Sequence, residues 1–128
     1  MTKTWQETSL VGTLGAEYAI NKPTGGTESM KERELYAAAV GKWGTTLQLV
    51  MVLEETAELQ KEVCKILRGD WSSPRMDSLA SEIADARLTL NQLEMITRTE
   101  SKVETERIAK LARLAKLLNV KFERTVKT

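Results

Sequence analysis

The chain has 128 residues, a formal net charge of +1 and 29% charged residues. This length fits one domain with a modest core, and the near-neutral charge gives no general attraction to nucleic acid or to an anionic membrane. Histidine is absent from the sequence, which excludes zinc sites built on imidazole, Ser-His-Asp triads and histidine acid–base catalysis. The single cysteine, Cys64, has no partner for an internal disulfide and suits a reducing compartment.

Residues 1–28 are predicted to form a loosely structured N-terminal arm. They hold most of the glycines and one of the two prolines, and their apolar residues show no sustained periodicity. Residues 1–12 lack the apolar run of a secretory signal, and the longest apolar run, residues 49–53, is too short to cross a bilayer. We therefore expect a soluble cytoplasmic protein with no membrane partner.

Four helical segments are predicted after this arm, and strand signals are absent. The first is expected to begin near Ser29, which has capping-box spacing with Glu32, and to extend to about Val40. Gly41 and Gly44 then predict a break.

The second helix is expected over about residues 45–67, where Gly69 follows as a C-terminal cap. A third is expected over about 75–97 and a fourth over about 101–119, because apolar residues recur there at alternating intervals of three and four. The sequence thus predicts an all-α fold, an antiparallel bundle of about four helices within residues 29–128. The apolar run 49–53 covers most of the circumference of the second helix, so one side should pack against a second copy. We expect a homodimer or homotetramer.

Two carboxylate clusters lie on neighbouring predicted helices. Glu55 and Glu58 are three residues apart on the second helix, and Glu82 and Asp85 are three apart on the third, so each pair lies on one side of its helix. If the two helices face each other, four carboxylates converge. A hard divalent cation with oxygen ligands, magnesium first, would neutralise such a cluster.

The alternative interpretation is that these acids are surface residues paired with Lys61, Lys65 or Arg87. It suits any single glutamate, since charged residues usually face solvent. It suits the two clusters together less well, because both lie among apolar residues that are expected to be buried.

The order EETAE, a glycine-ended helix, then EIAD resembles the EExxE…ExxD signature of the MazG-like nucleotide pyrophosphohydrolases, an all-α family. The resemblance extends from Trp43 to Leu114 and leaves the first 30 residues outside it. It implies Mg²⁺-dependent hydrolysis of a nucleoside triphosphate, or its deoxy form, to the monophosphate and pyrophosphate, with Mn²⁺ as a substitute. It also implies a helical dimer or tetramer.

By this resemblance, Glu55, Glu58, Glu82 and Asp85 match the metal ligands, and Glu54 matches the leading acid of the first motif. The residues themselves add that the general base should be a carboxylate, because no histidine is available. Glu54, Glu55 and Glu58 are the candidates for that catalytic role, and the sequence does not choose among them.

Five further residues are candidates for substrate binding. Gln48 lies seven residues before Glu55, on the same helical face, and is either a substrate contact or a buried amide. Trp43 either stacks on a nucleobase or closes the core at the helix break. Basic side chains that either contact phosphate or face solvent complete the set: Lys61, Lys110 and Arg113.

The sequence also allows other functions. One is that of a non-catalytic helical oligomer, whose acids would bind a structural cation or a basic partner. Nucleic-acid binding through the basic stretch 116–127 is disfavoured, because acids are interspersed there and aromatic residues are nearly absent. A related enzyme acting on phosphoribosyl-ATP would have the same site chemistry with a different substrate.

Overall fold

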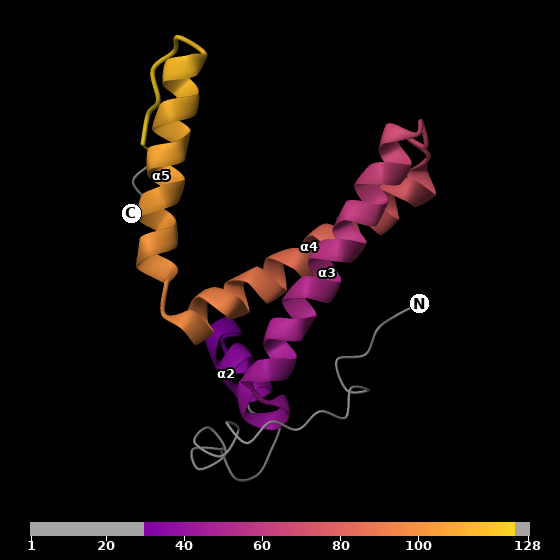
Figure 1. Cartoon of the computed structure of the whole chain (residues 1–128), viewed down its shortest axis with the longest axis vertical. Coiled ribbons are helices and arrows are strands. Elements are labelled where there is room, and N and C mark those ends of the chain that lie inside the picture. Colours follow the sequence, from indigo (N-terminus) through magenta and orange to yellow (C-terminus); the bar gives the residue numbers. More distant parts are fainter. Residues whose placement is uncertain (1–29, 125–128) are drawn as a thin grey trace. The chain divides into compact units, whose positions relative to one another are not determined.

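The computed structural model describes residues 30–124, so the predicted arm 1–28 and the expected cap at Ser29 lie outside the described residues. The described chain is all-helical, as predicted. Its four helices are α2 (Glu32–Trp43), α3 (Thr45–Leu67), α4 (Ser73–Thr97) and α5 (Glu100–Leu117) (Figure 1). The chain divides into two compact units between Ile96 and Thr97. The first unit contains α2, α3 and α4, and the second contains α5.

Helix α2 begins one residue after Lys31, whose backbone N–H donates to the Glu34 carboxylate at 2.8 Å. The helix continues through Gly41, so the predicted break lies only at Gly44. Gly44 has φ of 85°, a left-handed value that glycine adopts without steric cost. This one residue therefore joins α2 to α3 and turns the chain sharply between them.

Helix α3 ends as the sequence predicts. Gly69 has φ of 102°, its N–H donates to the Ile66 carbonyl oxygen, and the Asp70 N–H donates to the Lys65 carbonyl oxygen. This pair of hydrogen bonds is the Schellman motif, which satisfies carbonyl groups left over at a helix end. Because Gly69 stops α3 cleanly, α4 begins after a short turn and returns past α3 in the opposite general direction (Figure 1).

A network of ion pairs stabilises the turn between α3 and α4. The Arg75 guanidinium at the start of α4 donates to Glu62 of α3 at 2.6 Å and to Asp70 of the turn at 3.0 Å. Asp70 also accepts from the Ser72 hydroxyl and from the Ser72 N–H. Arginine suits this position because its planar group donates in two directions at once. The network therefore fixes how α4 leaves the turn.

Protonation of Asp70 is expected to weaken this turn in acid. The hydrogen bonds from Ser72, followed by that from Arg75, lower the pKa of Asp70 from 3.8 to about 2. A group whose pKa falls on folding adds stability above its unfolded pKa and loses it as the pH falls through the folded value. The stability that wild type gains over Asp70→Asn in urea unfolding should hold at pH 6 and vanish between about pH 4 and pH 2.

The control is Asp77→Asn, which removes one charge from an exposed position on α4. A difference between wild type and Asp70→Asn that stays constant from pH 6 to pH 2 would contradict this role of the carboxylate.

The core of the first unit is small and partly polar. Its buried apolar side chains among the described residues are Val40, Leu47, Met51 and Ala86. Buried beside them are polar or charged side chains of α3 and α4: Gln48, Glu55, Glu62, Thr89 and Gln92. Burial of polar groups is costly unless they are paired or bind a ligand. The polar residues of this core are therefore the place to look for a site.

The second unit contains an amphipathic helix. Helix α5 ends in a second Schellman motif, in which Asn119 adopts φ of 56° and the Val120 N–H donates to the Ala115 carbonyl oxygen. Ala115 is its one buried residue, and Lys110 lies 3.9 Å from Glu106 in an exposed ion pair. Among the helices of residues 30–124, none combines the length and the hydropathy needed to cross a bilayer.

Candidate metal centre

Three of the four predicted metal ligands lie together in the first unit. Glu55 comes from the middle of α3, and Glu82 and Asp85 come from successive turns of α4. One carboxylate oxygen from each residue lies within 4.8 Å of the other two. Glu55 is 2% exposed, and Glu82 and Asp85 are half-buried. The tertiary structure therefore brings acids 27 and 30 positions apart in sequence to one place between two helices.

The geometry and the donor atoms suit one hard cation. The oxygens around magnesium lie about 2.1 Å from the ion, so ligands on opposite sides are about 4.2 Å apart. The observed upper limit of 4.8 Å is only slightly wider. All three donors are carboxylate oxygens. Magnesium, calcium and manganese prefer oxygen ligands, whereas copper and zinc favour nitrogen or sulfur. These three acids could therefore hold one hard cation, and its identity as Mg²⁺ stays a prediction.

Glu58, the fourth predicted ligand, is half-buried one turn after Glu55 and is not one of the three clustered residues. Glu54 is exposed. Adjacent residues of an α-helix point about 100° apart, so the side chains of Glu54 and Glu55 leave α3 in different directions. Their predicted parts in catalysis, and that of Glu58 as a ligand, stay predictions.

Gln48 is the most unusual polar residue of the first unit. Its side chain is 2% exposed, and neither the amide oxygen nor the amide nitrogen has a hydrogen-bond partner in the part of the chain that the structure describes. An amide buried in this way costs about 1 to 3 kcal/mol. The sequence left two interpretations open, a substrate contact and a buried amide. The structure shows that the residue is buried. Because its amide atoms have no hydrogen-bond partner among the described residues, they could also bind a substrate, and that contact stays a prediction.

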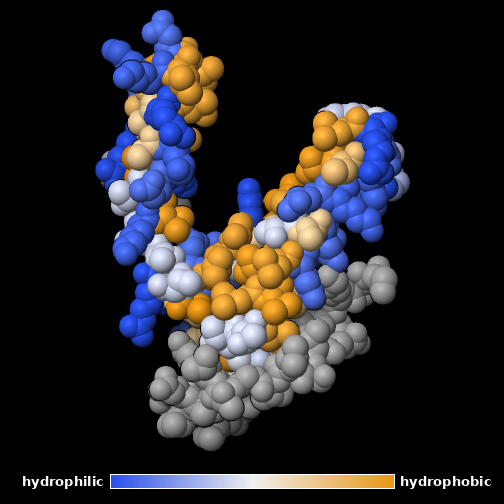
Figure 2. All heavy atoms as spheres, viewed as in Figure 1, coloured by the Kyte–Doolittle hydropathy of each residue, from blue (hydrophilic) through white to orange (hydrophobic). Residues whose placement is uncertain are grey.

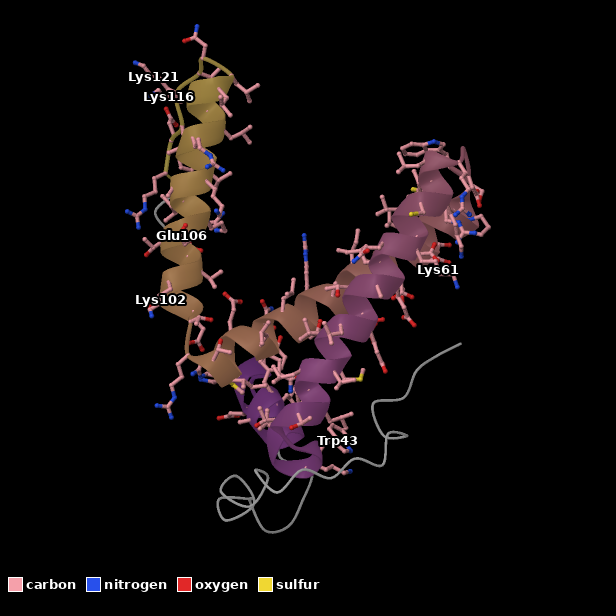
Figure 3. All side chains as sticks on the ribbon, in the orientation of Figure 1. Trp43, Lys61, Lys102, Glu106, Lys116 and Lys121 are labelled. Carbon is pink, nitrogen blue, oxygen red and sulfur yellow. The ribbon has the colours of Figure 1, made fainter. Side chains whose placement is uncertain are left out.

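The other two predicted substrate contacts of the first unit lie apart along the chain. Trp43 is half-buried at the end of α2, and the Lys42 ammonium lies 5.2 Å from the centre of its ring (Figure 3). Lys61 is exposed farther along α3, as Figure 3 shows. Lys110 and Arg113 are exposed residues of α5, in the second unit. A contact of any of the four with phosphate or base stays a prediction.

Two polar residues that no sequence pattern had singled out extend the buried side of α4 beyond Asp85. The Thr89 hydroxyl donates to the Ala86 carbonyl oxygen at 3.0 Å. The Gln92 amide nitrogen donates to the Tyr36 carbonyl oxygen at 3.4 Å, which links α4 to α2. The available signal was their spacing, because Asp85, Thr89 and Gln92 follow the helical period along one face.

A scan against models of protein families and searches of curated proteins and of solved structures find no match to this chain.

Proposed function

We propose that this protein is a magnesium-dependent nucleoside triphosphate pyrophosphohydrolase of the MazG-like type. The proposed reaction converts a (d)NTP and water to the (d)NMP and pyrophosphate. The observation that carries the proposal is the cluster of Glu55, Glu82 and Asp85, whose oxygens lie within 4.8 Å of one another. These residues belong to the two motifs, EETAE and EIAD, on which the resemblance depends.

In this proposal the three clustered acids hold the cation at the position where the substrate phosphates would bind. Magnesium, when bound, supplies positive charge for the phosphate oxygens and lowers the pKa of a coordinated water. The carboxylates keep the site too negative for a triphosphate to enter without a cation. Glu54, Glu55 and Glu58 are the candidates to accept the proton of the attacking water, since the chain has no histidine.

The proposed substrate contacts are polar or basic residues outside the cluster. The amide of Gln48 lies two helical turns before Glu55 on α3, about 10 Å along the helix axis. That separation allows Gln48 to contact the sugar or base of a nucleotide whose phosphates lie near the acids. Lys61, Trp43, Lys110 and Arg113 complete the set of proposed contacts.

A pyrophosphate-release screen tests the proposal. The full chain with Mg²⁺ is expected to release pyrophosphate from at least one member of a panel of canonical and modified NTPs and dNTPs, because a triphosphate is the ligand class that needs a bridging dication. The product should be the monophosphate, since release of inorganic phosphate alone indicates cleavage at a different bond. EDTA should abolish the release, and added Mg²⁺ or Mn²⁺ should restore it.

A second readout separates catalysis from cation binding. Both the enzyme and a non-catalytic protein with a structural cation predict that Mg²⁺ raises the melting temperature, because a ligand that binds only the folded state stabilises it. Only the enzyme predicts pyrophosphate release. A melting shift with no release across the whole panel would remove the proposed activity and support the structural cation.

A further inference from the structure

The C-terminal part of the second unit carries a concentrated positive charge. Residues 107–124 contain six Lys or Arg residues and one Glu, a formal charge of +5, whereas the whole chain carries +1. Four of these basic side chains are exposed and form no ion pair within the described residues: Arg113, Lys116, Lys121 and Arg124. Their charge is therefore available to a partner of opposite sign.

Large apolar side chains are exposed at the same end of the unit. They are between 40% and 78% exposed: Leu114, Leu117, Leu118, Val120 and Phe122. Figure 2 shows apolar atoms gathered on one side of the end of α5 and hydrophilic atoms along the other side. Lys116 and Lys121 lie at this same end (Figure 3). We call the five apolar residues, together with Lys116, Lys121 and Arg124, the C-terminal surface.

The local structure explains why both kinds of side chain meet there. Apolar residues recur at intervals of three and four on one side of α5, whereas Lys110, Arg113 and Lys116 recur every three residues on the other side. The left-handed conformation of Asn119 then reverses the chain, so that residues 120–124 begin beside the end of the helix. The segment therefore combines a basic face with an apolar face that carries leucine and phenylalanine.

We propose that the C-terminal surface binds the surface of a membrane that contains anionic lipids. Helices with a Lys- and Arg-rich face and an apolar Leu or Phe face lie in the plane of such a surface. The apolar side chains would enter the boundary between headgroups and acyl chains, while the long basic side chains reach the headgroup phosphates. Each Lys or Arg near an anionic surface strengthens binding about fivefold. This inference goes beyond the proposed activity, and its tests do not depend on turnover.

Two other occupants suit the C-terminal surface less well. A nucleic acid would pair with the basic residues, but exposed leucines gain nothing from its phosphates, and Phe122 is the one aromatic residue of 97–124 on which a base could stack. A second copy of the same surface would bring a second charge of the same sign into contact, and such like-charge contacts are costly. An anionic lipid surface satisfies both the charge and the apolar side chains.

The expectation of no membrane partner rested on the net charge of the whole chain and on the shortness of its apolar runs. Net charge averages over all 128 residues and does not describe a local concentration of one sign. Binding in the plane of the membrane also needs no segment that spans the bilayer. The structure thus favours a surface contact that those two properties of the sequence did not address.

The first test is co-sedimentation of the full chain with vesicles. We expect wild type to bind vesicles of phosphatidylcholine with about one-third phosphatidylserine at least tenfold more tightly than vesicles of phosphatidylcholine alone. High salt should weaken this binding, because it screens exposed charges. Lys116→Glu combined with Lys121→Glu should lower binding to the anionic vesicles at least tenfold, since two attractions become repulsions.

The matched control is Lys102→Glu combined with Lys61→Glu, which makes the same change of net charge at exposed residues outside the C-terminal surface. It should bind much as wild type does. Circular dichroism should show unchanged helicity in both double variants. Equal loss in the two double variants would overturn the assigned surface, as would equal binding of wild type to the two kinds of vesicle. Wild-type binding to a mixed-sequence DNA duplex without binding to anionic vesicles would instead assign the basic residues to nucleic acid.

A second test asks whether the apolar residues enter the membrane. Leu117→Cys in a Cys64→Ser background places one thiol on the C-terminal surface for a polarity-sensitive fluorophore. Its emission should shift to shorter wavelength when anionic vesicles are added, whereas the same label at Lys102→Cys should shift much less. A label at position 117 that stays in a water-like environment while the protein is bound to vesicles would overturn the insertion of the apolar face.

Discussion

Asp85→Asn is expected to lower pyrophosphate release at least about a hundredfold. The substitution replaces one of three clustered carboxylates with a neutral amide of nearly the same shape, so it removes charge and a strong ligand but little volume. Metal stabilisation of transition-state charge is worth several kcal/mol, and each 1.36 kcal/mol changes a rate tenfold. The measurement is kcat/KM for the best nucleotide of the screen, at several Mg²⁺ concentrations.

The matched control is Asp77→Asn, the same chemical change at an exposed position on the same helix, which should retain wild-type activity. Thermal melting separates a lost ligand from a lost fold. Without Mg²⁺, Asp85→Asn should still unfold cooperatively as a helical protein, because the amide nearly matches the shape of the carboxylate. With Mg²⁺, its melting temperature should rise less than that of wild type. Wild-type turnover by Asp85→Asn would refute the assigned role of the cluster.

Gln48→Met is expected to stabilise the fold by about 1 to 3 kcal/mol and to impair activity. Methionine has a length similar to glutamine, and it removes a buried amide that has no hydrogen-bond partner in the described part of the chain. The gain in stability should appear as a higher urea midpoint with an unchanged slope. If the amide contacts the nucleotide, kcat/KM should fall at the same time, since a natural protein retains such a residue for function at the expense of stability.

Gln92→Met provides the contrast. The Gln92 amide is also buried, but it donates to the Tyr36 carbonyl oxygen, so its replacement removes a hydrogen bond and should not stabilise the protein. Equal stability changes in the two variants would show that Gln48 is satisfied as well as Gln92. A stabilised Gln48→Met variant with full activity would leave the amide no part in substrate binding.

Local sequence signals identified most helix boundaries correctly. The second helix was predicted over residues 45–67 and is observed at those residues, because Gly44 and Gly69 both adopt left-handed backbone angles that end helices sharply. The break predicted at Gly41 was wrong. Glycine is tolerated inside a helix at a cost of about 1 kcal/mol, and Gly41 keeps the helical conformation there. A glycine thus marks a helix end reliably only where the chain must turn.

The site was predictable in part. A spacing of three along a helix placed Glu82 and Asp85 on one side without any tertiary information. The same spacing made Glu58 equivalent to Glu55. In the structure, however, Glu55 is the one acid of α3 that lies in the cluster with the acids of α4. The place where two helices cross determines which turn of each helix comes into contact. The pattern of a single helix does not contain that information.

The sequence by itself determined the all-helical class, the main helix ends and the acidic residue types, since these follow from local propensity and from helical periodicity. Tertiary structure alone decided which acids meet, that Gln48 is buried without a described hydrogen-bond partner, and that Arg75 ties Glu62 to Asp70. The physical reason is that these features arise from contacts between helices, where the direction of approach and the exclusion of water depend on the whole packed unit.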